Sequence, residues 1–88
     1  MKIKEGFLLR EVDGTAIVVA VGAAAKSFNG MITLNEVGAF LWKQIEAGAD
    51  EDGIVKALLA EYEVEEARAA ADVKAFIGKM REAGVLDE

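Results

Sequence analysis

The sequence of 88 residues contains no cysteine and no histidine, and these two absences exclude much of the chemistry available to small proteins. Without cysteine there is no thiolate nucleophile, disulfide or iron–sulfur ligand, and without histidine there is no imidazole base. Zinc sites built from these residue types are excluded too. We therefore expect no catalytic residues, no metal and no cofactor. We also expect packing alone to hold the chain together, which suits a reducing cytoplasm.

The sequence also contains few positively charged residues relative to negatively charged ones. Ten Lys and Arg residues stand against sixteen Asp and Glu residues, which gives a net charge of −6. Because nucleic acids and anionic membranes are bound through Lys and Arg, this balance argues against both as partners. The longest uncharged apolar run, residues 16–25, has about half of the ~20 residues that a bilayer span requires.

The length and the apolar fraction of 53% are typical of one small globular domain, which we expect to span residues 1–88. The first third is rich in strand-forming residues, and the remainder has the apolar spacing of helices. The predicted fold class is α+β, with a three-stranded antiparallel sheet followed by a three-helix bundle.

A β-hairpin is predicted where Asp13-Gly14 separates two apolar runs, residues 7–12 and 15–21. A two-residue Asp-Gly loop favours a type I′ turn, which fixes the register of the two strands. That register places Val12 opposite Thr15, Arg10 opposite Ile17, Leu8 opposite Val19, Leu9 opposite Val18, and Phe7 opposite Ala20. Both faces are largely apolar, so we expect the sheet to be sandwiched or covered by something else.

A small-residue connector over residues 22–26 and a second turn signal, Asn29-Gly30, precede the third strand. This strand, residues 31–34, is short and comes last, so we place it at the sheet edge. Asn35 and Asp50 are predicted to cap the first two helices, and Gly48 suits the end of the first.

The third helix is predicted from about Glu65 to Ala83, with Gly84 at its end and a start that no side chain caps. Val85 and Leu86 are expected to fold back onto the core. The glycines inside helices, Gly38 and Gly78, could mark close approach by another backbone, but we interpret Gly38 as simply tolerated.

A band of small residues runs along this third helix, with basic residues at both edges. The band is Ala67, Ala71, Ala75 and Gly78, flanked by Arg68 and Lys79 on one side and by Lys74 and Arg81 on the other. One interpretation is a soluble helix surface built from good helix formers. The other is a smooth, mildly basic wall against which an acidic, extended peptide could lie.

The segment 28–42 carries the most recognisable motif, in which Leu34-Asn35-Glu36 comes directly before a helix that contains Trp42. Further motifs are Ile54 with Leu58, Asp72-Val73 with Phe76-Ile77, and Gly84-Val85-Leu86. On these motifs, over about residues 6–86, the chain resembles the family of the pyrroloquinoline-quinone biosynthesis protein D, the PqqD-like proteins.

The resemblance implies a winged-helix-like domain that is not an enzyme but a recognition element for ribosomally made, post-translationally modified peptides. Such an element captures the leader segment of a precursor peptide and presents it to a modifying enzyme, often a radical S-adenosylmethionine enzyme. The leader adds as a strand beside the third strand, in a groove closed by the third helix. Segment 22–30 looks longer than in the protein that names the family, which favours a precursor other than that of the quinone pathway.

Carried over to this sequence, the resemblance implies a set of peptide-binding residues on two elements. The docking edge is Met31, Ile32, Thr33 and Leu34. The exposed side of the last helix contributes Arg68, Ala71, Asp72, Ala75 and Lys79, and Phe76 forms the groove floor.

Two other classes of function remain open. The first is a winged-helix DNA-binding regulator, which the net charge of −6 opposes. The second is an enzyme fragment, with Ser27 beside Lys26 as the nucleophile, or a purely structural subunit. The apolar sheet and its exposed edge also make a homodimer plausible.

Overall fold

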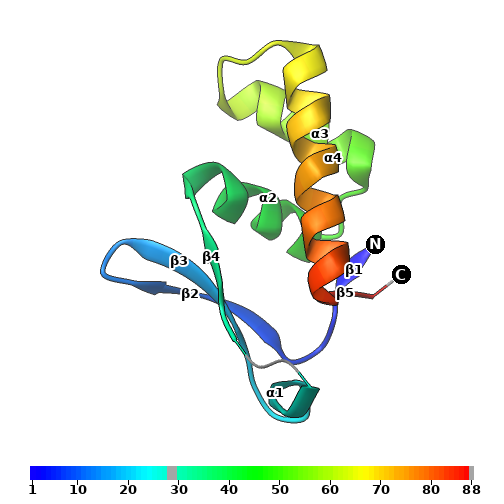
Figure 1. Cartoon of the computed structure of the whole chain (residues 1–88). Helices are drawn as coiled ribbons and strands as arrows, with labels where there is room; N and C mark the ends of the chain where they lie inside the picture. Colours follow the sequence, from blue (N-terminus) through cyan, green and yellow to red (C-terminus); the bar gives the residue numbers. More distant parts are fainter. Residues whose placement is uncertain (28–29, 88) are drawn as a thin grey trace.

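The computed structural model of the chain describes residues 1–27 and 30–87 (Figure 1). Its elements, in chain order, are β1 (Lys2–Ile3), β2 (Phe7–Val12), β3 (Thr15–Ala20), α1 (Ala24–Ser27), β4 (Ile32–Leu34), α2 (Glu36–Glu46), α3 (Glu51–Glu61), α4 (Glu66–Ala83) and β5 (Leu86–Asp87). The three-stranded sheet comes first and the three long helices follow it, so the predicted α+β architecture is confirmed.

The hairpin has the predicted turn and register. Asp13 and Gly14 both have positive φ, 52° and 79°, as a type I′ turn requires. Every predicted pair from Phe7↔Ala20 to Val12↔Thr15 is present. The second strand ends at Ala20, one residue earlier than expected. The turn therefore determines which side chains share each face of the sheet.

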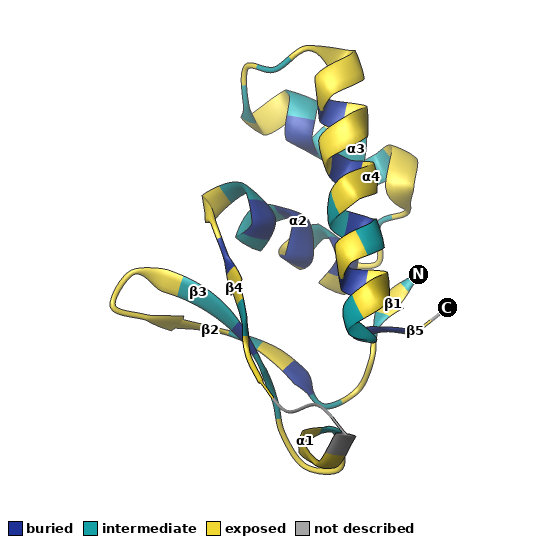
Figure 2. Cartoon of the chain, viewed as in Figure 1, coloured by how far each residue is buried: buried dark blue, intermediate teal, exposed yellow. Residues whose placement is uncertain are grey.

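The strand order is β2-β3-β4, with all pairs antiparallel. Among the described residues β4 pairs only with β3, so the predicted edge position is confirmed. The helices α2, α3 and α4 lie on one side of this sheet (Figure 1), and Figure 2 shows buried segments in both the sheet and these helices. The buried residues of the sheet are Phe7, Val18 and Leu34, which the strand register places on one face. The sheet is thus covered on one face only, in the part of the chain that the structure describes.

The core lies between this face and the three helices. Its largest fully buried side chains include Trp42 and Ile45 of α2, Ile54 of α3, and Val73 and Met80 of α4. The Nε1 atom of Trp42 is buried and has no hydrogen-bond partner among the described residues. The indole therefore stabilises the fold by packing.

The helix ends follow the predicted capping residues. The Oδ1 atom of Asn35 accepts a hydrogen bond from the Gly38 N–H at 2.7 Å, and Oδ1 of Asp50 accepts one from Gly53 N–H at 2.8 Å. Glu65 makes no side-chain cap, as expected. Gly84 ends α4 in the left-handed conformation at φ 78°.

Two features were not predicted. The first is the helical turn α1 in the connector of small residues, where three consecutive alanines favour a helix over an extended link. The second is the pairing of the short strands β1 and β5, which joins the two ends of the described chain through Ile3 and Leu86. Val85 and Leu86 themselves fold back onto the core and are buried, as expected. Asn29, one of the two residues of the second predicted turn, lies outside the described residues, as does Phe28.

Candidate functional site

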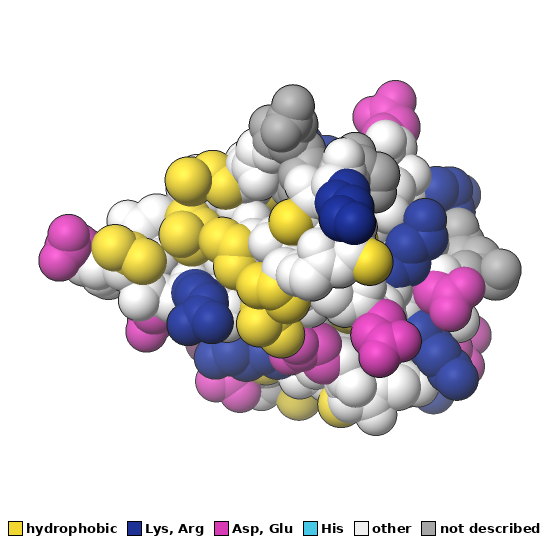
Figure 3. All heavy atoms as spheres, turned by 90° about the horizontal axis from the view of Figure 1, so that it is seen from below, with side chains coloured by type: hydrophobic (Ala, Val, Ile, Leu, Met, Phe, Trp, Pro, Cys, Tyr) yellow, Lys and Arg dark blue, Asp and Glu magenta, His cyan; other side chains and the backbone are white. Residues whose placement is uncertain are grey.

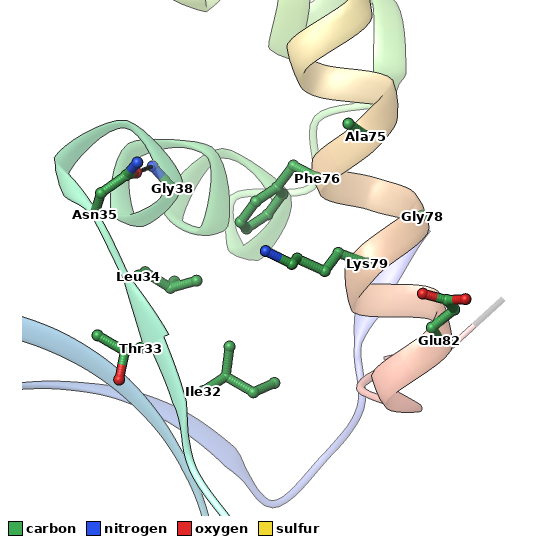
Figure 4. A pocket seen from close by; sticks show the side chains of 10 residues that line it. All are labelled: Ile32, Thr33, Leu34, Asn35, Gly38, Ala75, Phe76, Gly78, Lys79 and Glu82. Carbon is green, nitrogen blue, oxygen red and sulfur yellow. Dashed lines mark hydrogen bonds between the residues drawn. The ribbon is translucent and has the colours of Figure 1, made fainter.

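A hollow of about 690 Å³ lies between the free edge of β4 and the C-terminal half of α4 (Figure 4). Residues of β4 and the first turn of α2 form one side, and α4 forms the other. The lining residues are Ile32, Thr33, Leu34, Asn35, Gly38, Ala75, Phe76, Gly78, Lys79 and Glu82. An apolar strand edge and a helix wall therefore face each other across open space.

Side-chain alternation along β4 determines what the hollow presents. Ile32 and Leu34 point toward α4, whereas the Thr33 side chain points away (Figure 4). The half-buried ring of Phe76 extends from α4 toward the same space. The floor is consequently apolar, and Thr33 contributes its backbone to the rim.

The hairpin register shows which backbone groups of β4 face the open edge. In a two-residue hairpin the pair Val12–Thr15 exchanges hydrogen bonds, and bonding and non-bonding pairs alternate from there. Ile17, two residues on from Thr15, therefore directs its N–H and C=O to β2. Thr33, its partner on β4, directs its own N–H and C=O to the free edge. These groups are positioned to pair with an added strand.

Gly38 packs beside the hollow against β4 and α4. A Cβ at this position would lie 3.4 Å from Cβ of Leu34 and 3.5 Å from Cε1 of Phe76, which are ordinary van der Waals distances. Its distance to Oδ1 of Asn35 would be 3.2 Å, which is tight. The neighbours of Gly38 are thus side chains and the helix cap, not another backbone.

Charge at the hollow comes from α4. The Lys79 side chain extends toward the space, and Glu82 follows one turn later (Figure 4). Arg68 and Asp72 lie in the N-terminal half of α4, where they form an exposed ion pair at 3.5 Å. They do not line the hollow.

The structure thus brings together six of the predicted site residues and leaves four apart. The six that line the hollow are Ile32, Thr33, Leu34, Ala75, Phe76 and Lys79. Met31, exposed by 64%, precedes β4, and Arg68, Ala71 and Asp72 are exposed on α4 outside the hollow. The hollow is also lined by four residues that were not predicted, Asn35, Gly38, Gly78 and Glu82, although glycines inside helices are a signal that could have indicated the site.

The described residues include no group of acidic side chains arranged to hold a metal ion. Within residues 1–27 and 30–87, no helix is both long and apolar enough to cross a membrane. The side chain of Ser27 lies outside the described part of the structure.

Comparison with solved structures identifies two close matches in fold. One, TbiB1 in complex with the TbiA(beta) leader peptide, has a TM-score of 0.81 and 23% identity over 99% of this chain and 95% of that chain. The other, lasso peptide synthetase B1 complexed with the leader peptide, has a TM-score of 0.77 and 19% identity over 96% and 93%. No curated protein matches the chain in sequence.

The family model described as coenzyme PQQ synthesis protein D (PqqD) matches residues 8–86. This match includes the whole three-stranded sheet apart from its first residue, all the helices, and the edge of β4 with the hollow beside it. It also includes the motifs on which the resemblance was based. The chain therefore belongs to the PqqD family.

Proposed function

We propose that this chain binds the leader segment of a ribosomally made precursor peptide, which adds as a strand beside β4 under α4. The observation that carries this proposal is the edge of β4 that no described strand pairs with, where the Thr33 backbone is directed outward into an apolar hollow of about 690 Å³. Edge strands bind extended peptides through main-chain hydrogen bonds, and flanking pockets select alternate side chains.

Family membership and the two structural neighbours support this proposal. Both neighbours share the fold and are described as complexes with leader peptides. In this chain the same fold leaves a strand edge open beside a helix, as such binding requires. We further propose that the chain has no active site of its own and delivers the leader to a modifying enzyme, such as a radical S-adenosylmethionine enzyme.

The energetics show why both the edge and the hollow are needed. Each new hydrogen bond contributes about 0.5–1.5 kcal/mol, whereas association costs at least about 4 kcal/mol. Micromolar affinity requires about −8 kcal/mol. Backbone pairing along three residues of β4 falls short of that value, so apolar contacts must add to it. Burying one large apolar side chain of the leader contributes about 1.5–3 kcal/mol. The hollow offers such a side chain contacts with Ile32, Leu34 and Phe76.

The test is an NMR titration of the ¹⁵N-labelled chain with synthetic leader peptides from short reading frames beside its gene. We expect saturable shifts at the amides of residues 31–35 and 75–82, with a Kd in the micromolar range. A DNA duplex added in the same way is the control and is expected to cause no shifts. Binding confined to other residues, or no binding by any of these peptides, would overturn the proposal.

A further inference from the structure

The outer face of the sheet is uncovered and apolar. The exposed large hydrophobic side chains are Leu8 at 40%, Val12 at 51%, Val21 at 40% and Met31 at 64%. All four occupy outward positions on or directly beside the strands of the sheet. Figure 3, which views this side of the molecule from below, shows hydrophobic side chains gathered next to one another.

The strand register explains why these residues form one surface, which we call the outer face. Leu8 lies opposite Val19, and continuing the β3–β4 register by one residue brings Met31 to the far side of Val19. In the next row, Ile17 lies between Arg10 and Thr33. The whole outer face is Leu8, Arg10, Val12, Thr15, Ile17, Val19, Val21, Met31 and Thr33, and Arg10 is its sole charged member.

An apolar composition is unusual for the solvent-exposed face of a sheet. Antiparallel sheets of this kind normally alternate apolar residues inward with polar residues outward. An exposed apolar patch of several neighbouring side chains typically marks a protein interaction site. The described helices cover the inner face and leave this one open, which makes it available to a partner.

A second copy of the chain is poorly suited to bind the outer face. Each copy carries a net charge of −6, so two copies repel one another. A twofold contact through this face would also bring the two Arg10 side chains onto the same buried interface. Arg10 has no ion pair among the described residues, and burial without one is costly. The outer face is instead suited to a different protein, one whose contacting surface is apolar and carries a carboxylate opposite Arg10.

The outer face lies next to the hollow, and this position indicates which protein binds the outer face. Thr33 belongs to both surfaces, because its side chain lies on the outer face while its backbone lies on the free edge. A leader strand added to β4 would extend the outer face by one strand, with every second side chain outward. A protein docked on the outer face would therefore contact the bound leader as well.

We propose that the outer face docks the modifying enzyme, through an apolar enzyme surface with a carboxylate opposite Arg10. This proposal rests on the proposed function. It implies that the enzyme binds the leader-loaded chain more tightly than the empty chain. By thermodynamic linkage, the enzyme must then tighten leader binding by the same factor.

The test measures two affinities on the same set of variants by calorimetry. The first is the affinity for the leader peptide. The second is the affinity, with leader present, for the purified modifying enzyme whose gene lies next to the gene of this chain. The double variant Leu8→Thr/Val12→Thr removes apolar surface from β2, far from the groove, and Arg10→Glu reverses the charge. Thr15→Val, which adds apolar surface to the same face, is the matched control.

We expect the double variant and Arg10→Glu each to weaken enzyme binding by about tenfold or more, a typical loss at an interface centre. Their leader affinity is expected to be unchanged, and Thr15→Val is expected to lose neither affinity. If wild type does not bind leader, the proposed function fails. If leader binds but the variants retain full enzyme affinity, this inference fails while the proposed function stands. Sedimentation showing a dimer that the double variant dissociates, with enzyme binding intact, would assign the face to a second copy instead.

Discussion

Gly38 of α2 packs against Phe76 of α4, and a Cβ on the glycine would make van der Waals contact with the ring, 3.5 Å from Cε1. The two residues are 38 positions apart in the sequence, yet both line the hollow. The atom nearest to that Cβ would be Oδ1 of Asn35, at 3.2 Å. A side chain at position 38 would therefore press first on the cap of α2.

Replacing the two helical glycines by alanine is expected to have different effects on stability. A Cβ at Gly78 would meet none of the described atoms beyond its own stretch of helix within 4 Å, so Gly78→Ala should stabilise the chain by about 1 kcal/mol. At Gly38 the Cβ would press on the cap oxygen of Asn35 at 3.2 Å, which offsets that gain. Urea unfolding with unchanged m-values measures both effects. Equal stabilisation by the two substitutions would contradict the close approach.

Thr33→Pro is expected to abolish leader binding while the domain stays folded. Proline removes a backbone N–H that points to the free edge and that β3 does not use, and proline is tolerated at sheet edges. Thr33→Val keeps the N–H and is the matched control, for which we expect wild-type affinity. Calorimetric titration gives the affinities, and circular dichroism verifies the fold. Wild-type binding by a folded Thr33→Pro variant would show that the leader does not pair with β4.

Ala75→Trp is expected to weaken leader binding by about tenfold or more, because a bulky side chain would occupy part of the hollow. Ala70→Trp places the same side chain on the same helix at an exposed position outside the hollow, and should leave affinity unchanged. Both affinities are measured with the same leader peptide. Equal affinities for the two variants would exclude the α4 wall from the binding site.

Tyr62 is expected to ionise at a higher pH in the folded chain than in the unfolded chain. Partial burial, followed by the carboxylates of Glu36 and Glu61, raises the pKa of its hydroxyl. The stability that the neutral hydroxyl contributes is complete below the unfolded pKa, about 10, and is lost as pH rises through the folded pKa. Tyrosinate absorbance reports this titration directly, since Tyr62 is the single tyrosine.

Glu36→Gln is the companion variant for that titration. It removes one negative charge near the hydroxyl, so the pKa of Tyr62 should move back toward its ordinary value. The ring itself stays in place, because its edge-to-face contact with Phe40, at 5.6 Å between centroids, does not involve Glu36. If Tyr62 had the same pKa in the folded chain as in denaturant, the expected rise in its pKa from burial and neighbouring carboxylates would be contradicted.

Local signals account for the predictions that the structure confirms. The Asp13-Gly14 pair determines the hairpin register because few residues other than glycine, asparagine and aspartate adopt positive φ readily. Asn35 and Asp50 begin their helices because each side chain reaches a backbone N–H three residues away. These interactions lie within a few residues, so the sequence specifies them without knowledge of the rest of the fold.

The sequence by itself determined the order of the elements, the hairpin register, the helix ends and the resemblance that identified the PqqD family. Only the tertiary structure decided that the C-terminal half of α4, with Gly78 and Glu82, lines the hollow, while Arg68 and Ala71 lie outside it. It also decided which apolar face of the sheet the helices cover. How far α4 is shifted along β4 depends on packing between residues distant in the chain, such as Gly38 and Phe76, and no local pattern encodes that shift.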